Sequence, residues 1–317
     1  MVTAPNSLHS PAVPAKSGAL PEPIVLVAIA VTLVAWASAF IVIRGSGADY
    51  SPGALALGRM IVGTAALGVL TIGRRWVRPT RRELLMILAF GALWFGAYNV
   101  LLGLAEKTID AGTTAMIVGI GPILIGLGSG LLLKEGVTRW LIIGTAAAFA
   151  GVLLIGISSG VDGAHLGYGV AAAVGAAITY AAGVLFQKPV LRRLPVSQVT
   201  FIGAVAGAVV CLPFAGSLVS DIAAAPLAST LGVVYLGVVP TAVAFTTWGF
   251  ALSRMPAGQL GITTYLVPPL VIIAGLFVFR EIPTVLAIAG GILCLAGVGL
   301  SRRQSTSKLR KTIPRAA

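Results

Sequence analysis

Residues 24–43 read IVLVAIAVTLVAWASAFIVI, an uninterrupted apolar run of the length that a helix needs to cross a membrane. About 20 apolar residues span about 30 Å of hydrocarbon. The run exceeds the apolar region of about 7–15 residues in a secretory signal, which argues against cleavage at Ala37-Ser38-Ala39. We therefore expect a first transmembrane helix here. A disordered tail is expected before it, over residues 1–22, where few side chains are apolar.

Nine further apolar runs follow, separated by short polar segments. They cover residues 53–73, 84–104, 111–133, 140–157, 166–186, 197–214, 228–250, 257–279 and 284–300. Strands of a transmembrane barrel would instead alternate apolar and polar residues. Only 10% of the 317 residues are charged, whereas a soluble domain carries about 25%. The sequence therefore predicts an all-α polytopic membrane protein with ten transmembrane helices.

The Lys and Arg residues predict the orientation of these helices. If the N-terminus is cytoplasmic, 18 of the 22 basic residues fall on cytoplasmic segments and 3 on the opposite side. Basic residues favour the cytoplasmic side, so both termini are expected there. The net charge of +13 lies in clusters between the apolar runs, which indicates a membrane surface as partner and not nucleic acid.

The two halves of the chain resemble each other at an offset of 146 residues. Pro122 then aligns with Pro268, and Lys134-Glu135 with Arg280-Glu281. Each half has five spans, an odd number, so the second half would enter the membrane inverted. Inverted repeats are typical of secondary transporters, whose binding site lies near mid-membrane between the repeats. The expected units are residues 23–160, residues 161–300 and a basic cytoplasmic tail over 301–317, with contact between this tail and anionic lipid as an alternative to full solvation.

Several short motifs form a set, and the members of this set in the fourth expected span recur in the ninth. The set comprises Trp36-Ala37-Ser38-Ala39-Phe40, Ser51-Pro52-Gly53, Gly58-Arg59, Ala111-Gly112, Pro122 and Glu135, and then Ala257-Gly258, Pro268 and Glu281. In these motifs the chain resembles the drug/metabolite transporter superfamily, in its branch with two EamA-type repeats. The resemblance implies a ten-helix carrier of the bacterial inner membrane that moves small metabolites, often by exporting amino acids or related compounds. It also implies a central cavity lined by spans 1–4 and 6–9, with spans 5 and 10 at the periphery.

Polar and aromatic side chains inside the spans are candidates for binding a solute, because each polar group costs free energy in lipid. The candidates are Trp36, Arg59, Tyr98, Asn99, Tyr180, Thr241, Trp248, Gln259, Thr263 and Tyr265. Asn99 and Gln259 stand out, since a primary amide facing lipid is especially unfavourable. Aromatic rings with a few amides and hydroxyls would suit a small zwitterionic or amphipathic solute. Alternatively, the threonines bond to their own helices and the aromatics anchor the interface.

Arg59 is the only charged residue within an expected span, about 10 Å from its outer end. It is interpreted either as a clamp for a substrate carboxylate or as a side chain that snorkels or makes a structural contact. Pro122 and Pro268 are expected to kink their helices, as hinges or for packing. Glu135 and Glu281 are expected either to act as gate contacts or to form solvated charge pairs at the interface.

Together these features predict a secondary active transporter of a small metabolite that works by alternating access, as an exporter or alternatively as an uptake carrier. An integral-membrane enzyme, a channel or a lipid scramblase is less consistent with the sequence. No H-E-x-x-H or Walker A motif occurs. Two cysteines and two histidines give no metal-ligand spacing, and no cofactor is expected. The expected partners are a small-molecule substrate and the lipid bilayer, with a monomer or loose homodimer as the assembly.

Overall fold

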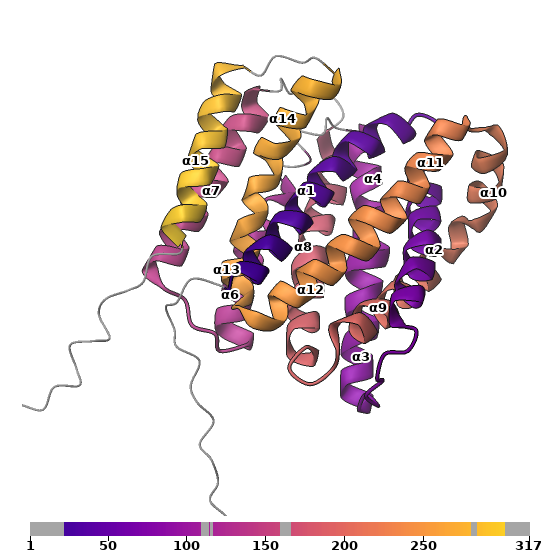
Figure 1. The fold of residues 1–317 in the computed structure, drawn as a ribbon. Helices are drawn as coiled ribbons and strands as arrows, with labels where there is room; N and C mark the ends of the chain where they lie inside the picture. Colours follow the sequence, from indigo (N-terminus) through magenta and orange to yellow (C-terminus); the bar gives the residue numbers. More distant parts are fainter. Residues whose placement is uncertain (1–21, 109–113, 115–116, 159–165, 280–283, 302–317) are drawn as a thin grey trace, which may run out of the picture.

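The computed structural model describes residues 22–108, 114, 117–158, 166–279 and 284–301, and these residues form helices and no strands (Figure 1). In this part of the chain, seven helices are long and apolar enough to cross a membrane, and three shorter apolar helices accompany them. The seven cover Pro23–Ile43, Pro52–Thr71, Arg81–Lys107, Tyr168–Val190, Val196–Ala224, Leu227–Arg254 and Ala257–Gly275. The three shorter ones are Gly121–Leu132, Arg139–Leu154 and Ile288–Ser301. The prediction of an all-α polytopic membrane protein is confirmed.

Three of the seven crossing helices are single α-helices, and the other four change geometry along their length. The first repeat contains α1 (Pro23–Ser46), α2 (Pro52–Thr71), α3 (Arg81–Phe90), η1 (Gly91–Ala97), α4 (Tyr98–Thr108), α6 (Gly121–Leu132) and α7 (Arg139–Ser158). The second repeat begins with α8 (Leu166–Val190), α9 (Val196–Cys211), η3 (Leu212–Phe214) and α10 (Ala215–Ala224). It continues with α11 (Leu227–Leu236), η4 (Gly237–Val243), α12 (Ala244–Arg254), α13 (Ala257–Thr263), η5 (Thr264–Leu266), α14 (Val267–Phe279) and α15 (Val285–Ser301).

The segments η1 and η4 are π-helices of seven residues each, and they are related by the offset of 146 residues. Each begins at a glycine where another helix approaches closely. A Cβ atom on Gly91 would lie 2.1 Å from the carbonyl oxygen of Gly203, and one on Gly237 would lie 2.5 Å from Cβ of Val62. Short π segments inside α-helices often mark functional sites. The sequence repeat is thus matched by a repeated local distortion in the middle of the bundle.

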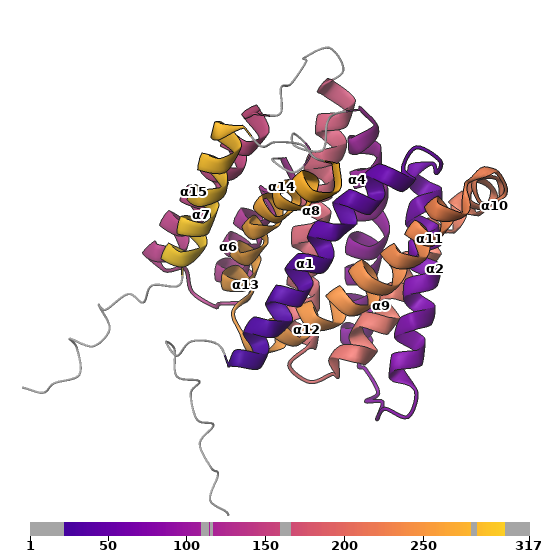
Figure 2. The same ribbon diagram turned by 45° about the horizontal axis from the view of Figure 1, so that its top comes forward.

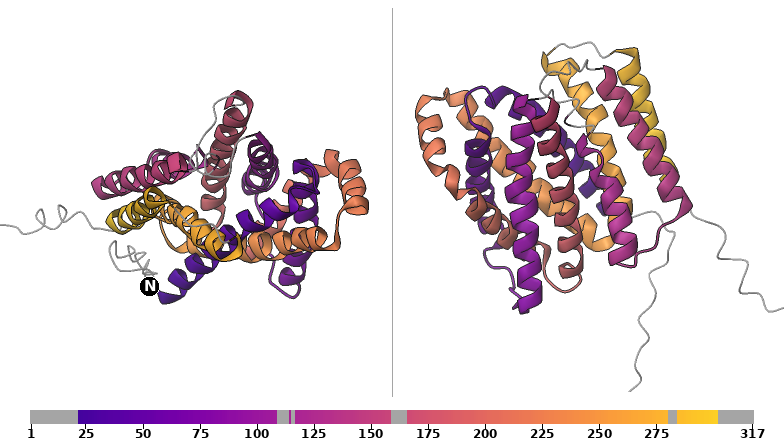
Figure 3. Two further views of the ribbon diagram at one scale, coloured as in Figure 1. Left: turned by 90° about the horizontal axis from the view of Figure 1, so that it is seen from above. Right: turned by 180° about the vertical axis from the view of Figure 1, so that it is seen from behind.

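Helices α7 and α15 pack against each other through glycines at the edge of the bundle (Figure 3). A Cβ atom on Gly144 would lie 2.5 Å from the carbonyl oxygen of Gly297, and one on Gly151 would lie 2.5 Å from that of Gly290. Gly290 and Gly297 are the repeat equivalents of Gly144 and Gly151, so exchanging the two repeats converts each contact into the other. Reciprocal contacts of this kind are those of a two-fold axis. The peripheral position expected for spans 5 and 10 is confirmed.

Both repeats interrupt a helix just before the equivalent prolines. In the first repeat a turn at residues 119–120 precedes α6, in which Pro122 occupies the first helical turn. In the second repeat the 3₁₀ segment η5 separates α13 from α14, which has Pro268 as its second residue. The Tyr265 hydroxyl donates to the carbonyl oxygen of Gly119 at 2.7 Å and ties the two interruptions together. The prolines therefore begin helical segments and do not kink continuous ones, because proline is tolerated in a first turn.

The helical segment that begins with α9 is longer than the sequence predicts, because the expected span ended at residue 214. It continues through η3 into α10, which stands out at the edge of the bundle (Figure 2). The backbone N–H and the hydroxyl of Ser51 donate to Asp221 Oδ2 at 2.8 and 2.9 Å, so α10 is docked on the start of α2. Polar contacts thus hold α10 where the apolar pattern ends.

Large apolar side chains cover the outside of the bundle, as expected for a surface that faces lipid. Leu131, Phe277 and Val285 are 78%, 78% and 85% exposed, and a soluble protein rarely exposes many such residues together. Helix α1 begins and α15 ends on the same face of the bundle (Figure 1). We refer to the face that contains Pro23 and Ser301 as the terminal face, and to the other as the opposite face.

Candidate functional site

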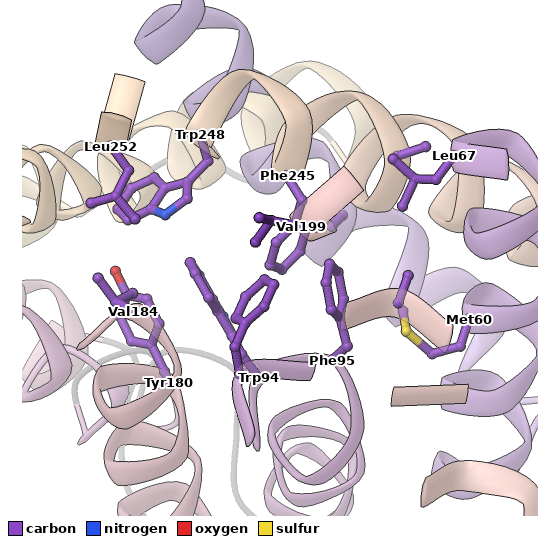
Figure 4. Packing of buried hydrophobic residues seen from close by; sticks show 14 of the residues in the cluster. Met60, Leu67, Trp94, Phe95, Tyr180, Val184, Val199, Phe245, Trp248 and Leu252 are labelled. Atoms are coloured by element: carbon purple, nitrogen blue, oxygen red, sulfur yellow. The ribbon is translucent and has the colours of Figure 1, made fainter. Parts of the chain in front are cut away.

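A cluster of aromatic rings fills the centre of the bundle between the two repeats (Figure 4). Trp94, in η1, lies at its middle, with ring centroids 5.8 Å from Trp36, 5.0 Å from Tyr180, 4.8 Å from Phe245 and 5.5 Å from Trp248. These rings come from α1 and η1 in the first repeat and from α8 and α12 in the second. The structure therefore brings Trp36, Tyr180 and Trp248 together, as the sequence suggested, and adds Trp94 and Phe245.

Several polar atoms at this centre lack hydrogen-bond partners among the residues that the structure describes. They are Nε1 of Trp248 and the hydroxyl of Tyr180, and both amide atoms of Gln187 are likewise unpaired two turns further along α8. The Tyr180 hydroxyl faces Thr264 without reaching hydrogen-bond distance. Native proteins leave few buried polar groups unpaired. Unpaired groups that lie between aromatic rings and two repeats can bind the polar parts of a solute.

Arg59 is buried within α2, at 7% exposure, and contacts the second repeat. Its Nε and Nη2 atoms donate to Oγ1 of Thr241, in η4, at 3.3 and 3.2 Å. The same hydroxyl donates to the carbonyl oxygen of Leu236 at 2.8 Å, a bond that fixes its position. Trp36 binds the neighbouring residue, because its Nε1 donates to the carbonyl oxygen of Pro240 at 3.3 Å. Arg59 and Thr241 thus lie beside the aromatic cluster, and Arg59 does not snorkel out of the bundle.

The prediction that Arg59 is the only charged residue within a span is wrong, because Glu106 also lies within one. The expected span ended at residue 104, whereas α4 continues to Thr108 and carries Glu106. Oε1 of Glu106 is buried and has no hydrogen-bond partner. Its charge acts on that of Arg59. The helical spacing of Asn99, Gly103 and Glu106, which places all three on one face, was the available signal.

The remaining candidates are bonded to backbone or lie elsewhere. The Asn99 amide donates to the carbonyl oxygen of Phe95 at 2.8 Å, and the Thr263 hydroxyl donates to that of Leu260 at 2.6 Å. Asn99 therefore compensates a carbonyl group of the π segment η1. Gln259 has an exposed side chain near the start of α13, where the amide can reach the interface, so the structure does not bring it to the centre. Tyr98 is half-buried, with its ring 6.1 Å from that of Tyr180.

Glu135 takes part in a polar contact between the repeats at the terminal face. Its Oε2 accepts from the backbone N–H of Ala257 at 2.7 Å, and its Oε1 lies 3.7 Å from Nζ of Lys188. Lys188 also donates to the carbonyl oxygens of Leu252 and Met255 at 2.5 and 2.7 Å. We refer to these five residues as the latch. Glu281, its repeat equivalent, lies outside the described residues.

Two further contacts join the repeats at the terminal face. The Gln198 side-chain amide accepts from the Val77 N–H at 2.9 Å and donates to the Val77 carbonyl oxygen at 2.8 Å. Arg193 forms an ion pair with Glu83, which raises the pKa of the Arg193 guanidinium above its ordinary value. In this structure the terminal face is therefore held closed by several bonds between elements of opposite repeats.

The described residues contain no group of three or more His, Cys, Asp or Glu side chains that could hold a metal ion. Aromatic rings, an arginine, a carboxylate and unpaired amide and hydroxyl groups can hold a small polar or amphipathic molecule.

Comparison with known proteins agrees with this geometry. The EamA-like transporter family matches the chain twice, over residues 23–157 and 167–303. A probable terminal-alkyne amino-acid exporter of Streptantibioticus cattleyicolor is 35% identical over 288 residues, which is 90% of this chain and 95% of that protein. A probable amino-acid metabolite efflux pump of Salmonella typhimurium is 23% identical over 84% of this chain and 90% of its own. A solved crystal structure shares the fold, with a TM-score of 0.71 and 20% identity over 88% of this chain and 97% of the other. The chain belongs to the EamA-like transporter family and is a transporter, not an enzyme.

Proposed function

We propose that this protein is a secondary exporter of amino acids or closely related metabolites. The observation that carries the proposal is the central site, where Arg59 lies beside aromatic rings from both repeats that pack edge to face. A guanidinium can hold a carboxylate through two parallel bonds, and aromatic rings suit an apolar side chain. The names of the two relatives, an amino-acid exporter and an amino-acid metabolite efflux pump, support the same substrate class.

Transport proceeds by alternating access around this site. Ten crossings arranged as two inverted repeats agree with the seven long and three short apolar helices and with the reciprocal glycine contacts of α7 and α15. The terminal face is the cytoplasmic one, because the segments expected there carry most of the basic residues. The latch then closes the cytoplasmic side. The interruptions at Pro122 and Pro268 supply places where the two helices can bend.

The protein acts in the bacterial inner membrane, with both termini in the cytoplasm. A single chain supplies every element of the central site, which fits a monomer or a loose homodimer. Its partners are the substrate and the lipid bilayer.

The test is export from membrane vesicles of defined orientation. Inside-out vesicles containing the wild-type protein should accumulate labelled amino acids from the medium faster than vesicles with Trp94→Ala, which removes the central ring of the site. A matched control is Trp76→Ala, since Trp76 is exposed and lies outside the aromatic cluster. Equal rates for wild type and Trp94→Ala across all 20 amino acids would refute the proposed substrate class. Transport only in right-side-out vesicles would favour uptake.

A further inference from the structure

We propose that Glu106 and Arg59 form a two-charge site for a zwitterion, in which Arg59 binds the carboxylate and Glu106 binds the primary ammonium group. The inference rests on the proposed function and deepens it. It assigns a role to Glu106 and restricts the substrate class to molecules that carry both charged groups.

Glu106 is half-buried, and one of its carboxylate oxygens has spare bonding capacity. Its Oε1 has no hydrogen-bond partner although it is shielded from solvent. An ionised carboxylate accepts about four hydrogen bonds, and leaving them unmade in a buried site is costly. Among the described residues, no Lys or Arg lies within 4 Å of this carboxylate. The structure thus contains a buried acceptor that a cationic donor can satisfy.

Arg59 is likewise incompletely satisfied. A guanidinium has five N–H donors, and the described contacts of Arg59 engage two nitrogen atoms with one neutral hydroxyl, that of Thr241. A neutral acceptor does not compensate a positive charge in a buried site. The Thr241 hydroxyl instead holds the planar group in place while it remains able to bind an anion.

The two charged groups lie on opposite sides of one helix contact. A Cβ atom on Gly103 of α4 would lie 2.8 Å from Cβ of Pro52, the first residue of α2. Glu106 lies about one turn beyond Gly103, and Arg59 lies seven residues into α2 from Pro52. The charges of Glu106 and Arg59 act on each other without forming an ion pair. A zwitterion placed between them presents its negative group to Arg59 and its positive group to Glu106.

Tyr98 connects this charged region to the aromatic cluster. It begins α4, the helix that carries Glu106, and its ring lies 6.1 Å from that of Tyr180. An apolar side chain of the same molecule can therefore extend towards Tyr180 and Trp94. The arrangement favours an amino acid with an apolar or unsaturated side chain over a dicarboxylate or a diamine.

The simplest alternative is that Glu106 only balances the charge of Arg59. Both roles predict that Glu106→Gln weakens the protein, so stability alone does not separate them. Selectivity does. If Glu106 only balances the charge of Arg59, the protein should not prefer a ligand that carries an ammonium group over one that lacks it. If Glu106 binds the ammonium group, the protein should show this preference.

The experiment uses the full-length protein in lipid nanodiscs and three probes of equal shape: L-leucine, 4-methylpentanoate, which lacks the ammonium group, and L-leucinamide, which lacks the carboxylate. Binding is followed by the fluorescence of the central tryptophans. The wild type should bind leucine at least about tenfold more tightly than either analogue. Glu106→Gln should lose the preference over 4-methylpentanoate, and Arg59→Gln should lose the preference over leucinamide. Glu22→Gln, at an exposed position, should keep both.

Retained preference for leucine over 4-methylpentanoate in folded Glu106→Gln would overturn the inference and leave the proposed function intact. If Glu106→Gln does not fold, Glu106→Asp decides the question. The shorter carboxylate should keep the preference at reduced affinity, and equal binding of leucine and 4-methylpentanoate by this variant would reject the inference. Wild-type protein that binds none of the three probes and exports no amino acid would refute the proposed function itself.

Discussion

Replacing Glu135 by glutamine should open the terminal face of the carrier. The substitution keeps the size of the side chain and removes its charge, so the attraction to Lys188 disappears while the acceptor for the Ala257 N–H remains. The two charges lie 3.7 Å apart with side chains only 11% and 12% exposed. Coulomb's law with an effective dielectric constant of about 20 gives about 4 kcal/mol of attraction.

Part of that attraction is offset by the cost of burying both charges. A hydrogen bond to a charged group contributes about 1.5–3 kcal/mol net, and we take about 2 kcal/mol for the latch. Because 1.4 kcal/mol corresponds to a factor of ten, Glu135→Gln should raise the ratio of open to closed terminal face about 30-fold. In this variant Lys188 can still donate to the carbonyl oxygens of Leu252 and Met255. These two bonds limit the effect of the substitution on opening.

The assay is labelling of a cysteine introduced as Leu252→Cys, because the Leu252 side chain is fully buried and only its backbone carbonyl group takes part in the latch. Cys211 and Cys294 are first replaced by alanine, and a membrane-impermeant maleimide is added to inside-out vesicles. Labelling in the Glu135→Gln background should be at least about tenfold faster than in the Glu135 parent, and Glu22→Gln should leave the rate unchanged. An unchanged labelling rate in folded Glu135→Gln protein would refute the view that this contact holds the face closed.

Four further outcomes are expected. Gly297→Leu should lower the thermal unfolding temperature by several degrees, because even a Cβ atom there would lie 2.4 Å from the backbone nitrogen of the neighbouring helix α7; an unchanged melting curve would contradict the close packing. Gln187→Leu removes two buried unpaired atoms and should stabilise the protein by about 1–2 kcal/mol in chemical denaturation, yet slow transport; normal transport would assign the amide to packing alone. Alanine at Pro122 or Pro268 should reduce turnover several-fold with affinity preserved, measured in proteoliposomes, and full turnover in both variants would leave the prolines a packing role. Ala48→Cys should react with an impermeant maleimide in intact cells, whereas reaction only after permeabilisation would reverse the proposed orientation.

The sequence predicted the global features of the fold because they depend on hydrophobicity and symmetry. Length and apolarity identified the membrane helices, and the offset of 146 residues also relates the two π segments and the glycine contacts of α7 and α15, neither of which the sequence predicted. The sequence alone could not show that Asn99 bonds to the carbonyl group of Phe95, because the π geometry that frees this carbonyl is created by tertiary packing.

The candidate site was predicted in part. The sequence named Trp36, Tyr180 and Trp248 as candidates for one site, whereas it left open whether Arg59 snorkels to the interface or lies inside the bundle. Glu106 was missed because hydropathy places the end of a helix only to within a few residues. The partner of Arg59, Thr241, lies 182 residues away, and no spacing rule reaches that far.

The matched π segments also bear on the history of the chain. A π segment contains one more residue than the α-helical turn it replaces, and that residue rotates the rest of the helix by about 100° about its axis. Two separate insertions would have to arise independently at the same place to give η1 and η4 their common bounds at the 146-residue offset. A single insertion, made in a half-length ancestor before the gene was duplicated, accounts for both. The two halves of this chain therefore share, besides their sequence repeat, the same rotation of the helix that follows each π segment.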